Sequence, residues 1–217
     1  MFLSEGFKKR MKELAGIILA ENSFFPNPET KKKKKKLRPN LEGAKIEILP
    51  VTADDLDELL DICNQVLKFP GFSDICTYDD RIKDLFQPEL SFKAVLNDKP
   101  IGFYFCSDKE GLNDFLKETF FAPGTVKLFF DEHLYEDLQN KRGLQGVAVG
   151  ILEEYRRFGI GRMLMDKPKE LGYDYLWAVQ TEHVSDVSKW LKRSQHLAHF
   201  FMKRNQRNFN ITVEKYQ

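Results

Sequence analysis

Apolar and polar positions beyond residue 44 follow two periods, which predicts strands and helices in mixed order. Residues 45–50 alternate like a strand, and Thr52 is placed to cap a helix whose apolar positions recur every three or four residues. Residues 91–96 and 101–106 read as two strands joined by an Asn-Asp-Lys-Pro hairpin turn. Further strands are expected at 146–151, 173–180 and 209–215, and helices at 79–86, from Gly159 onward, at 185–194 and at 196–204.

This order predicts an α/β fold of the α+β type rather than a plain doubly wound parallel sheet, because a hairpin interrupts the strand–helix alternation. Residues 107–143 are rich in Phe and Leu and fit neither period cleanly. We interpret them as an insertion between the third and fourth strands, with partial helix and strand.

The first 44 residues differ from the rest in pattern and in charge. Apolar residues recur on one face of an expected helix at Leu3, Phe7, Met11, Leu14 and Ile18. Six consecutive lysines follow at 31–36, in a stretch that we interpret as a solvated linker. Residues 1–44 carry a net charge of about +6 and the remainder about −5, within a total of +1. The sequence therefore predicts two parts, a basic arm over 1–44 and a folded domain over 45–217.

The basic arm suits an anionic partner, whether a membrane surface, an acidic protein or a nucleic acid. It equally suits a helix that packs on its own domain, since short helices need tertiary contacts. The sequence has no apolar run of 18 residues that would predict a transmembrane helix, and no signal peptide pattern. Three cysteines without CxxC spacing argue against a disulfide framework or a metal site and favour a reducing, cytoplasmic location.

The stretch 147–164 carries the clearest chemistry. An apolar strand leads into a turn with Arg156 and Arg157, then Gly159 and Gly161, then a helix with Arg162. Glycine lets the backbone approach a ligand closely, and free amides at a helix start attract anions, so the stretch suits a pyrophosphate. A dinucleotide-binding fingerprint would need a third glycine where Leu164 stands. A Walker-type phosphate-binding loop is excluded as well, because no Gly-Lys-Ser/Thr follows. The alternative to a pyrophosphate site is a tight turn between a strand and a helix, with arginines that bind no ligand.

The run 154–164, Glu-Tyr-Arg-Arg-Phe-Gly-Ile-Gly-Arg-Met-Leu, resembles the acetyl-CoA motif of the GCN5-related N-acetyltransferases (GNAT). The resemblance extends over 45–217. Residues 46–67 are similar to that family's first strand and helix, 92–105 to its second and third strands, and 173–180 to its fifth. It implies a mixed, mostly antiparallel sheet flanked by helices, with strands four and five splayed apart.

The resemblance also implies acetyl-CoA as cosubstrate. Strand four would pair by backbone with the pantetheine arm, and the turn amides would hold the pyrophosphate between arginine side chains. The implied cofactor-binding residues are Val149, Ile151, Arg156, Arg157, Phe158, Gly159, Ile160, Gly161 and Arg162.

The expected reaction is direct attack of a primary amine on the thioester, which requires a base. Glu182 and His183 end the expected fifth strand and are the candidates; an ordinary loop histidine is the alternative for His183. The acceptor is an amine of a small molecule, a protein or an aminoacyl-tRNA. Phe201 aligns with the tyrosine that serves the family as acid, in the helix expected at 196–204. This departure leaves a rival hypothesis, a catalytically degenerate binding module acting through its basic arm.

Overall fold

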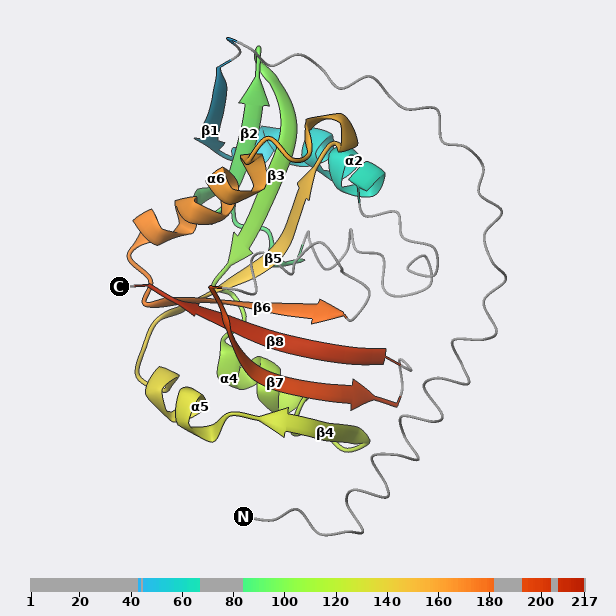
Figure 1. Ribbon diagram of the computed structural model, residues 1–217, viewed down its shortest axis with the longest axis vertical. Helices are drawn as coiled ribbons and strands as arrows, with labels where there is room; N and C mark the ends of the chain where they lie inside the picture. The colour runs from blue at the N-terminus through green and yellow to red at the C-terminus, as the bar shows by residue number, and fades with distance from the viewer. Residues whose placement is uncertain (1–42, 44, 67–83, 182–192, 204–206, 217) are drawn as a thin grey trace, which may run out of the picture. The chain divides into compact units, whose positions relative to one another are not determined.

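The computed structural model describes residues 43, 45–66, 84–181, 193–203 and 207–216, and their eight strands form one sheet (Figure 1). The strands are β1 (Ile46–Pro50), β2 (Phe92–Leu96), β3 (Lys99–Ser107), β4 (Thr125–Phe130), β5 (Gly143–Ile151), β6 (Tyr175–Thr181), β7 (Gln195–Met202) and β8 (Arg207–Lys215). Their order is β1-β2-β3-β5-β6-β8-β7-β4, and all neighbours are antiparallel except β5 and β6. The predicted mixed, mostly antiparallel sheet is confirmed.

Helices α2 and α6 lie where the sequence predicts a helix, after the first strand and after the glycine-bearing turn. The α-helices are α2 (Leu56–Val66), α4 (Leu112–Glu118), α5 (Glu132–Leu138) and α6 (Ile160–Asp166), with short 3-10 turns η2 (Ala53–Asp55), η3 (Pro88–Leu90), η4 (Glu153–Tyr155) and η5 (Lys167–Leu171). The Asp55 carboxylate accepts from the Thr52 amide at 2.7 Å and so caps the start of η2 and α2. Asn97 and Asp98 have φ of 51° and 60°, the conformation that a two-residue hairpin turn requires.

The helices cover both faces of the sheet. Phe103 and Phe105 pack with α2, whereas Tyr104, between them on β3, packs with α6, because successive strand residues point to opposite faces. On β6, Leu176 packs with α6 and Trp177 with α4. Helices α2 and α4 therefore share one face, and α6 lies on the other.

The segment between β3 and β5 contains α4, β4 and α5, so the expected partial helix and strand are confirmed there. Strand β4 pairs with β7 at the far edge of the sheet (Figure 1). The C-terminal half thereby gains a fourth strand and a helix that packs on Trp177 through Phe115.

The helix expected at 196–204 is wrong, because these residues form strand β7. Ala198, Phe200 and Met202 are buried while His199 and Phe201 between them are less so, which is a period of two. Pairing with β8 and β4 on both sides decides the outcome. Phe201 is therefore not in a helix, and its alignment with the family's tyrosine is wrong.

Other expectations lie outside the described residues. These are the arm over 1–42 and most of the helices expected at 79–86 and 185–194.

The contact between α2 and β5 leads to a stability prediction. A Cβ added at Gly150 would lie 2.5 Å from Val66 Cγ2 and 2.7 Å from Phe103 Cε1, both side chains in a packed layer. We expect Gly150→Ala to lower the free energy of unfolding by about 1–3 kcal/mol through overpacking. Urea unfolding measures the effect. Gly111→Ala is the control, since its Cβ would meet only Asp114 Oδ2 at 3.6 Å. Equal stability of the two variants would show that α2 does not press on β5.

Candidate functional site

The site begins where the two parallel strands part. Strands β5 and β6 pair over four residues only, from Gly143–Tyr175 to Gly146–Ala178. Beyond that point β5 continues along β3 as far as Ile151, and β6 continues along β8 (Figure 1). The facing edges of β5 and β6 are therefore not paired with each other past Gly146, and the expected splay is confirmed. We call the space between these edges the slot.

Backbone groups of β5 face the slot at two positions. The Leu152 amide donates to the Ile101 carbonyl of β3 at 3.0 Å. Because the backbone groups of successive strand residues point to alternate sides, the N–H and C=O of Val149 and Ile151 point away from β3, towards the slot. Both residues thus have the orientation that pairing with an extended, amide-containing ligand needs, although the Ile151 carbonyl also accepts from Arg156 Nε.

A turn rich in free amides follows at the open end of β5. Arg157 and Gly159 both have left-handed backbone conformations, with φ of 73° and 82°, and Gly159 is the N-cap of α6. Within the described part of the chain, the amides of residues 157–161 donate to no protein acceptor. A Cβ at Gly159 would meet nothing within 4 Å, and one at Gly161 only Ile151 Cδ1, at 3.2 Å. The turn therefore presents accessible donors to a bound anion.

The arginines around this turn are less free than its amides. Arg156 Nε donates to the Ile151 carbonyl at 3.0 Å and fastens the turn to the end of β5. Arg162 Nε lies 3.8 Å from Asp166 Oδ2 on the next helical turn. Arg157 is exposed. An anion bound here would rely chiefly on the backbone, with the arginines adding positive potential.

Large apolar side chains are exposed near the same turn. Val149, Phe158 and Met163 have 38–41 % of their surface accessible, whereas Ile160 and Leu164 anchor α6 in the core. The turn thus combines hydrogen-bond donors for an anion with apolar surface for an uncharged part of a ligand.

The two expected catalytic residues, Glu182 and His183, lie outside the described residues. The described histidines are elsewhere: His133 is on α5, and His196 and His199 are on β7, which β8 separates from β6. The slot edges formed by 147–151 of β5 and by Val179 and Gln180 of β6 carry no ionisable side chain. Among the described residues, no three His, Cys, Asp or Glu gather as metal ligands.

A buried pair near the closed end of the slot was not predicted from the sequence. A Cβ at Gly146 would lie 2.5 Å from the Tyr104 hydroxyl, which shares a buried cluster with Cys106 on the α6 face. Burial raises the pKa of Tyr104 well above its usual value, and likewise the pKa of the Cys106 thiol. Both stay protonated at neutral pH, so neither is a base. The only sequence signal for this pair was the strand pattern of β3, in which residues two apart, such as Tyr104 and Cys106, face the same side.

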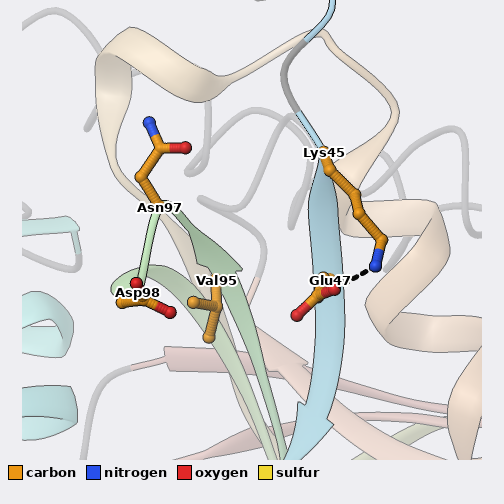
Figure 2. Close-up of a pocket in the computed structure, with 5 residues that line it drawn as sticks. All are labelled: Lys45, Glu47, Val95, Asn97 and Asp98. Carbon is orange, nitrogen blue, oxygen red and sulfur yellow. Dashed lines mark ion pairs between the residues drawn. The ribbon is translucent and has the colours of Figure 1, made fainter.

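A hollow elsewhere on the surface lies outside this arrangement. Figure 2 shows it between β1 and the β2–β3 turn, lined by Lys45, Glu47, Val95, Asn97 and Asp98, with Lys45 paired to Glu47. In the sheet order β3 stands between this edge and β5. The hollow has no part in the slot.

Solved structures with a similar fold include an N-acetyltransferase. The ribosomal-protein-S18-alanine N-acetyltransferase from Escherichia coli superposes with a TM-score of 0.53 at 12% identity, over 80% of this chain and 95% of that one. Ard1 from Thermoplasma volcanium gives 0.52 at 14%, over 79% and 98%. Naa50 from Arabidopsis thaliana, in complex with the bisubstrate analogue CoA-Ac-MVNAL, gives 0.51 at 17%, over 79% and 99%.

The similarity lies in the structure rather than in the sequence, since no family model and no curated protein sequence matches the chain. The mostly antiparallel sheet and the parting of β5 from β6 agree with the fold that the acetyl-CoA motif implies. The chain therefore has the fold of the GCN5-related N-acetyltransferases.

Proposed function

We propose that the chain is an acetyl-CoA-dependent N-acetyltransferase that transfers an acetyl group to a primary amine by direct attack. One observation supports this most: a strand edge with outward-facing backbone groups at Val149 and Ile151 leads straight into the unpartnered amides of 157–161. Pantetheine carries amides that can pair with a strand edge, and pyrophosphate is an anion that suits free amides. Both features of CoA are thus matched in the order in which they occur along the molecule.

In this proposal the turn amides from Arg157 to Gly161, including those of Phe158 and Ile160, bind the pyrophosphate. Arg156 holds the turn in place, and Arg162 adds positive charge. When bound, acetyl-CoA supplies an acetyl group activated as a thioester. The protein holds this group at the closed end of the slot and receives the proton of the attacking amine. Glu182 and His183, which follow β6 directly in sequence, are the proposed bases.

The acceptor remains open among an amine of a small molecule, a protein and an aminoacyl-tRNA. The acidic domain favours a cationic acceptor through charge attraction, and the basic arm favours an anionic partner. The analogue bound to the Arabidopsis protein joins CoA to a peptide, so this fold accommodates a peptide amine there. None of the described helices is long and apolar enough to cross a membrane. We propose a cytoplasmic location on the cysteine pattern alone.

One observation favours a second candidate, a binding module that has lost catalysis: the described slot edges carry no ionisable side chain. The two candidates differ in turnover. The test incubates the full chain with acetyl-labelled acetyl-CoA and a panel of peptides and small amines, and measures labelled amide and free thiol together. Labelled amide formed in step with thiol supports the transferase. Tight acetyl-CoA binding without labelled amide across the panel and in whole lysate would favour the module.

The arm gives a separate prediction. Every element of the proposed site lies beyond residue 142, so deletion of residues 1–43 should leave acetyl-CoA affinity and thermal stability unchanged. The deletion should instead alter the choice of acceptor or the location in the cell. Calorimetry and thermal melts of the full and shortened chains provide the comparison. If the shortened chain loses its fold or its acetyl-CoA affinity, the arm belongs to the domain and the division at residue 44 is wrong.

A further inference from the structure

Two buried polar groups at the closed end of the slot have no hydrogen-bond partner. Gln145 Oε1 and Trp177 Nε1 are both inaccessible, and neither atom is bonded to any described residue. Gln145 is 3 % and Trp177 0 % exposed. Buried polar groups in folded proteins are nearly always paired, so two orphans in one place call for an explanation.

These groups are neighbours by register. Gln145 on β5 is the pairing partner of Trp177 on β6, one step below Gly146 and Ala178, the last pair before the strands part. Paired residues of adjacent strands point to the same face, here the face that carries α4, whose Phe115 ring lies 5.3 Å from the Trp177 ring. The two side chains thus lie one register step below the closed end of the slot, on the face that carries α4.

The surroundings leave both atoms free rather than pairing them. Ser107 on β3 stands opposite Gln145, but its hydroxyl donates to Gln87 Oε1 at 2.8 Å. Leu116, Leu197 and Phe200 are other members of the cluster around Trp177, and none of their side chains can accept a hydrogen bond. One of these atoms is an acceptor and the other a donor, on residues that are paired across neighbouring strands, so a ligand that satisfies both must offer one donor and one acceptor.

An acetyl group under attack by an amine offers this combination. Resting on the proposed function, a thioester bound by the turn amides would reach the closed end, because the five steps of β5 from Ile151 to Gly146 span about 16 Å, similar to an extended pantetheine arm. We propose that Trp177 Nε1 donates to the acetyl carbonyl oxygen and that Gln145 Oε1 accepts from the N–H of the incoming amine.

The reaction places growing charge on both contacts. The amine nitrogen forms a bond to the carbonyl carbon, the carbon–sulfur bond breaks, the thiolate leaves and takes up a proton, and the nitrogen loses one. As the nitrogen bonds, negative charge builds on the carbonyl oxygen beside the indole N–H and positive charge on the N–H beside the Gln145 oxygen. Neither side chain titrates, so the proton leaves by another group. Gln145 and Trp177 act by stabilising the charge and positioning the two reactants.

A comparison of acetyl-CoA with CoA tests this role without any acceptor, because only acetyl-CoA carries the acetyl carbonyl. The protein has two tryptophans, so ¹⁵N-labelled indole signals are few, and Trp177→Phe assigns the signal of interest. We expect acetyl-CoA to move the Trp177 indole N–H signal downfield and CoA to leave it in place, with both ligands binding by calorimetry. The same signal position with either bound ligand would overturn the proposal while leaving acetyl-CoA binding intact. If a water molecule merely bridges the two side chains, the indole signal should have the same position with acetyl-CoA and with CoA. Binding of neither ligand would instead overturn the proposed function.

Enzyme kinetics provide a second test, which uses the best acceptor found in the amine panel. Gln145→Leu and Trp177→Phe should each lower kcat/KM at least about tenfold, with acetyl-CoA affinity within about twofold of wild type. Tyr175→Phe is the matched control, because it removes a buried hydroxyl from the same strand and face, two residues away. A folded Trp177→Phe protein with the turnover of Tyr175→Phe would contradict the proposal. If the panel holds no acceptor, the indole signal decides.

Discussion

Gly161→Glu should abolish acetyl-CoA binding in a protein that remains folded. Gly161 is the second residue of α6, and its amide is among those of 157–161 without a protein partner. A glutamate here places bulk and negative charge where the pyrophosphate is expected. Two unit charges 4 Å apart repel by about 4 kcal/mol near a protein surface, which corresponds to about a thousandfold in affinity.

The fold should tolerate this change. Among the described residues, the only neighbour within 4 Å of a new Cβ is the flexible end of Ile151, at 3.2 Å. An acidic residue in the first turn of a helix is favourable. Gly161→Gln and Gly161→Ala separate charge from bulk, so affinity should fall in the order Ala, Gln, Glu. Calorimetry and thermal melts of the three variants measure the two effects. Unchanged acetyl-CoA affinity in a folded Gly161→Glu protein would rule out this turn as the pyrophosphate site.

His183→Ala should lower turnover by roughly 10²–10⁴-fold while acetyl-CoA affinity is kept, if His183 receives the amine proton. The protein has four histidines. His133 lies on α5, and β8 separates His196 and His199 from β6, so His183 is the one that follows the slot in sequence. A histidine base must be neutral, so wild-type turnover should rise as the pH passes about 6.5, and His183→Ala should lose this limb of the profile.

His196→Ala is the control, since it removes an exposed histidine from β7. It should keep both the rate and the pH profile. Near-normal turnover of His183→Ala between pH 6 and pH 9 would show that His183 is not the base. The base would then be Glu182, which the Glu182→Gln variant tests, or a water molecule.

Local sequence patterns predicted most of the strands, turns and helices, because these elements depend on residues that are close together in sequence. Asn97 and Asp98 adopt the positive φ that their turn requires, and the paired glycines at 159 and 161 mark the loop before α6. The resemblance predicted the parting of β5 and β6, which no single segment encodes. The helix expected at 196–204 failed because pairing on both edges of β7 outweighed helix-forming residues.

Contacts between distant segments could not be predicted. Nothing near 125–130 in sequence indicates that β4 crosses to the far edge beside β7. Gln145 and Trp177 are 32 residues apart and become neighbours only through the register of β5 against β6. Their missing hydrogen bonds depend on the packing of Phe115 and on Ser107 bonding elsewhere, which a linear pattern does not record.

Calorimetric titration of the full chain with acetyl-CoA tests most directly whether the slot and the turn form one acetyl-CoA site. Pantetheine and pyrophosphate, titrated separately, divide the ligand into the parts assigned to Val149 and Ile151 and to the amides of 157–161. We expect one acetyl-CoA bound per chain, competition by each fragment, and loss of pyrophosphate binding in Gly161→Glu. No heat of binding at millimolar acetyl-CoA, from a chain shown to be folded, would contradict this expectation.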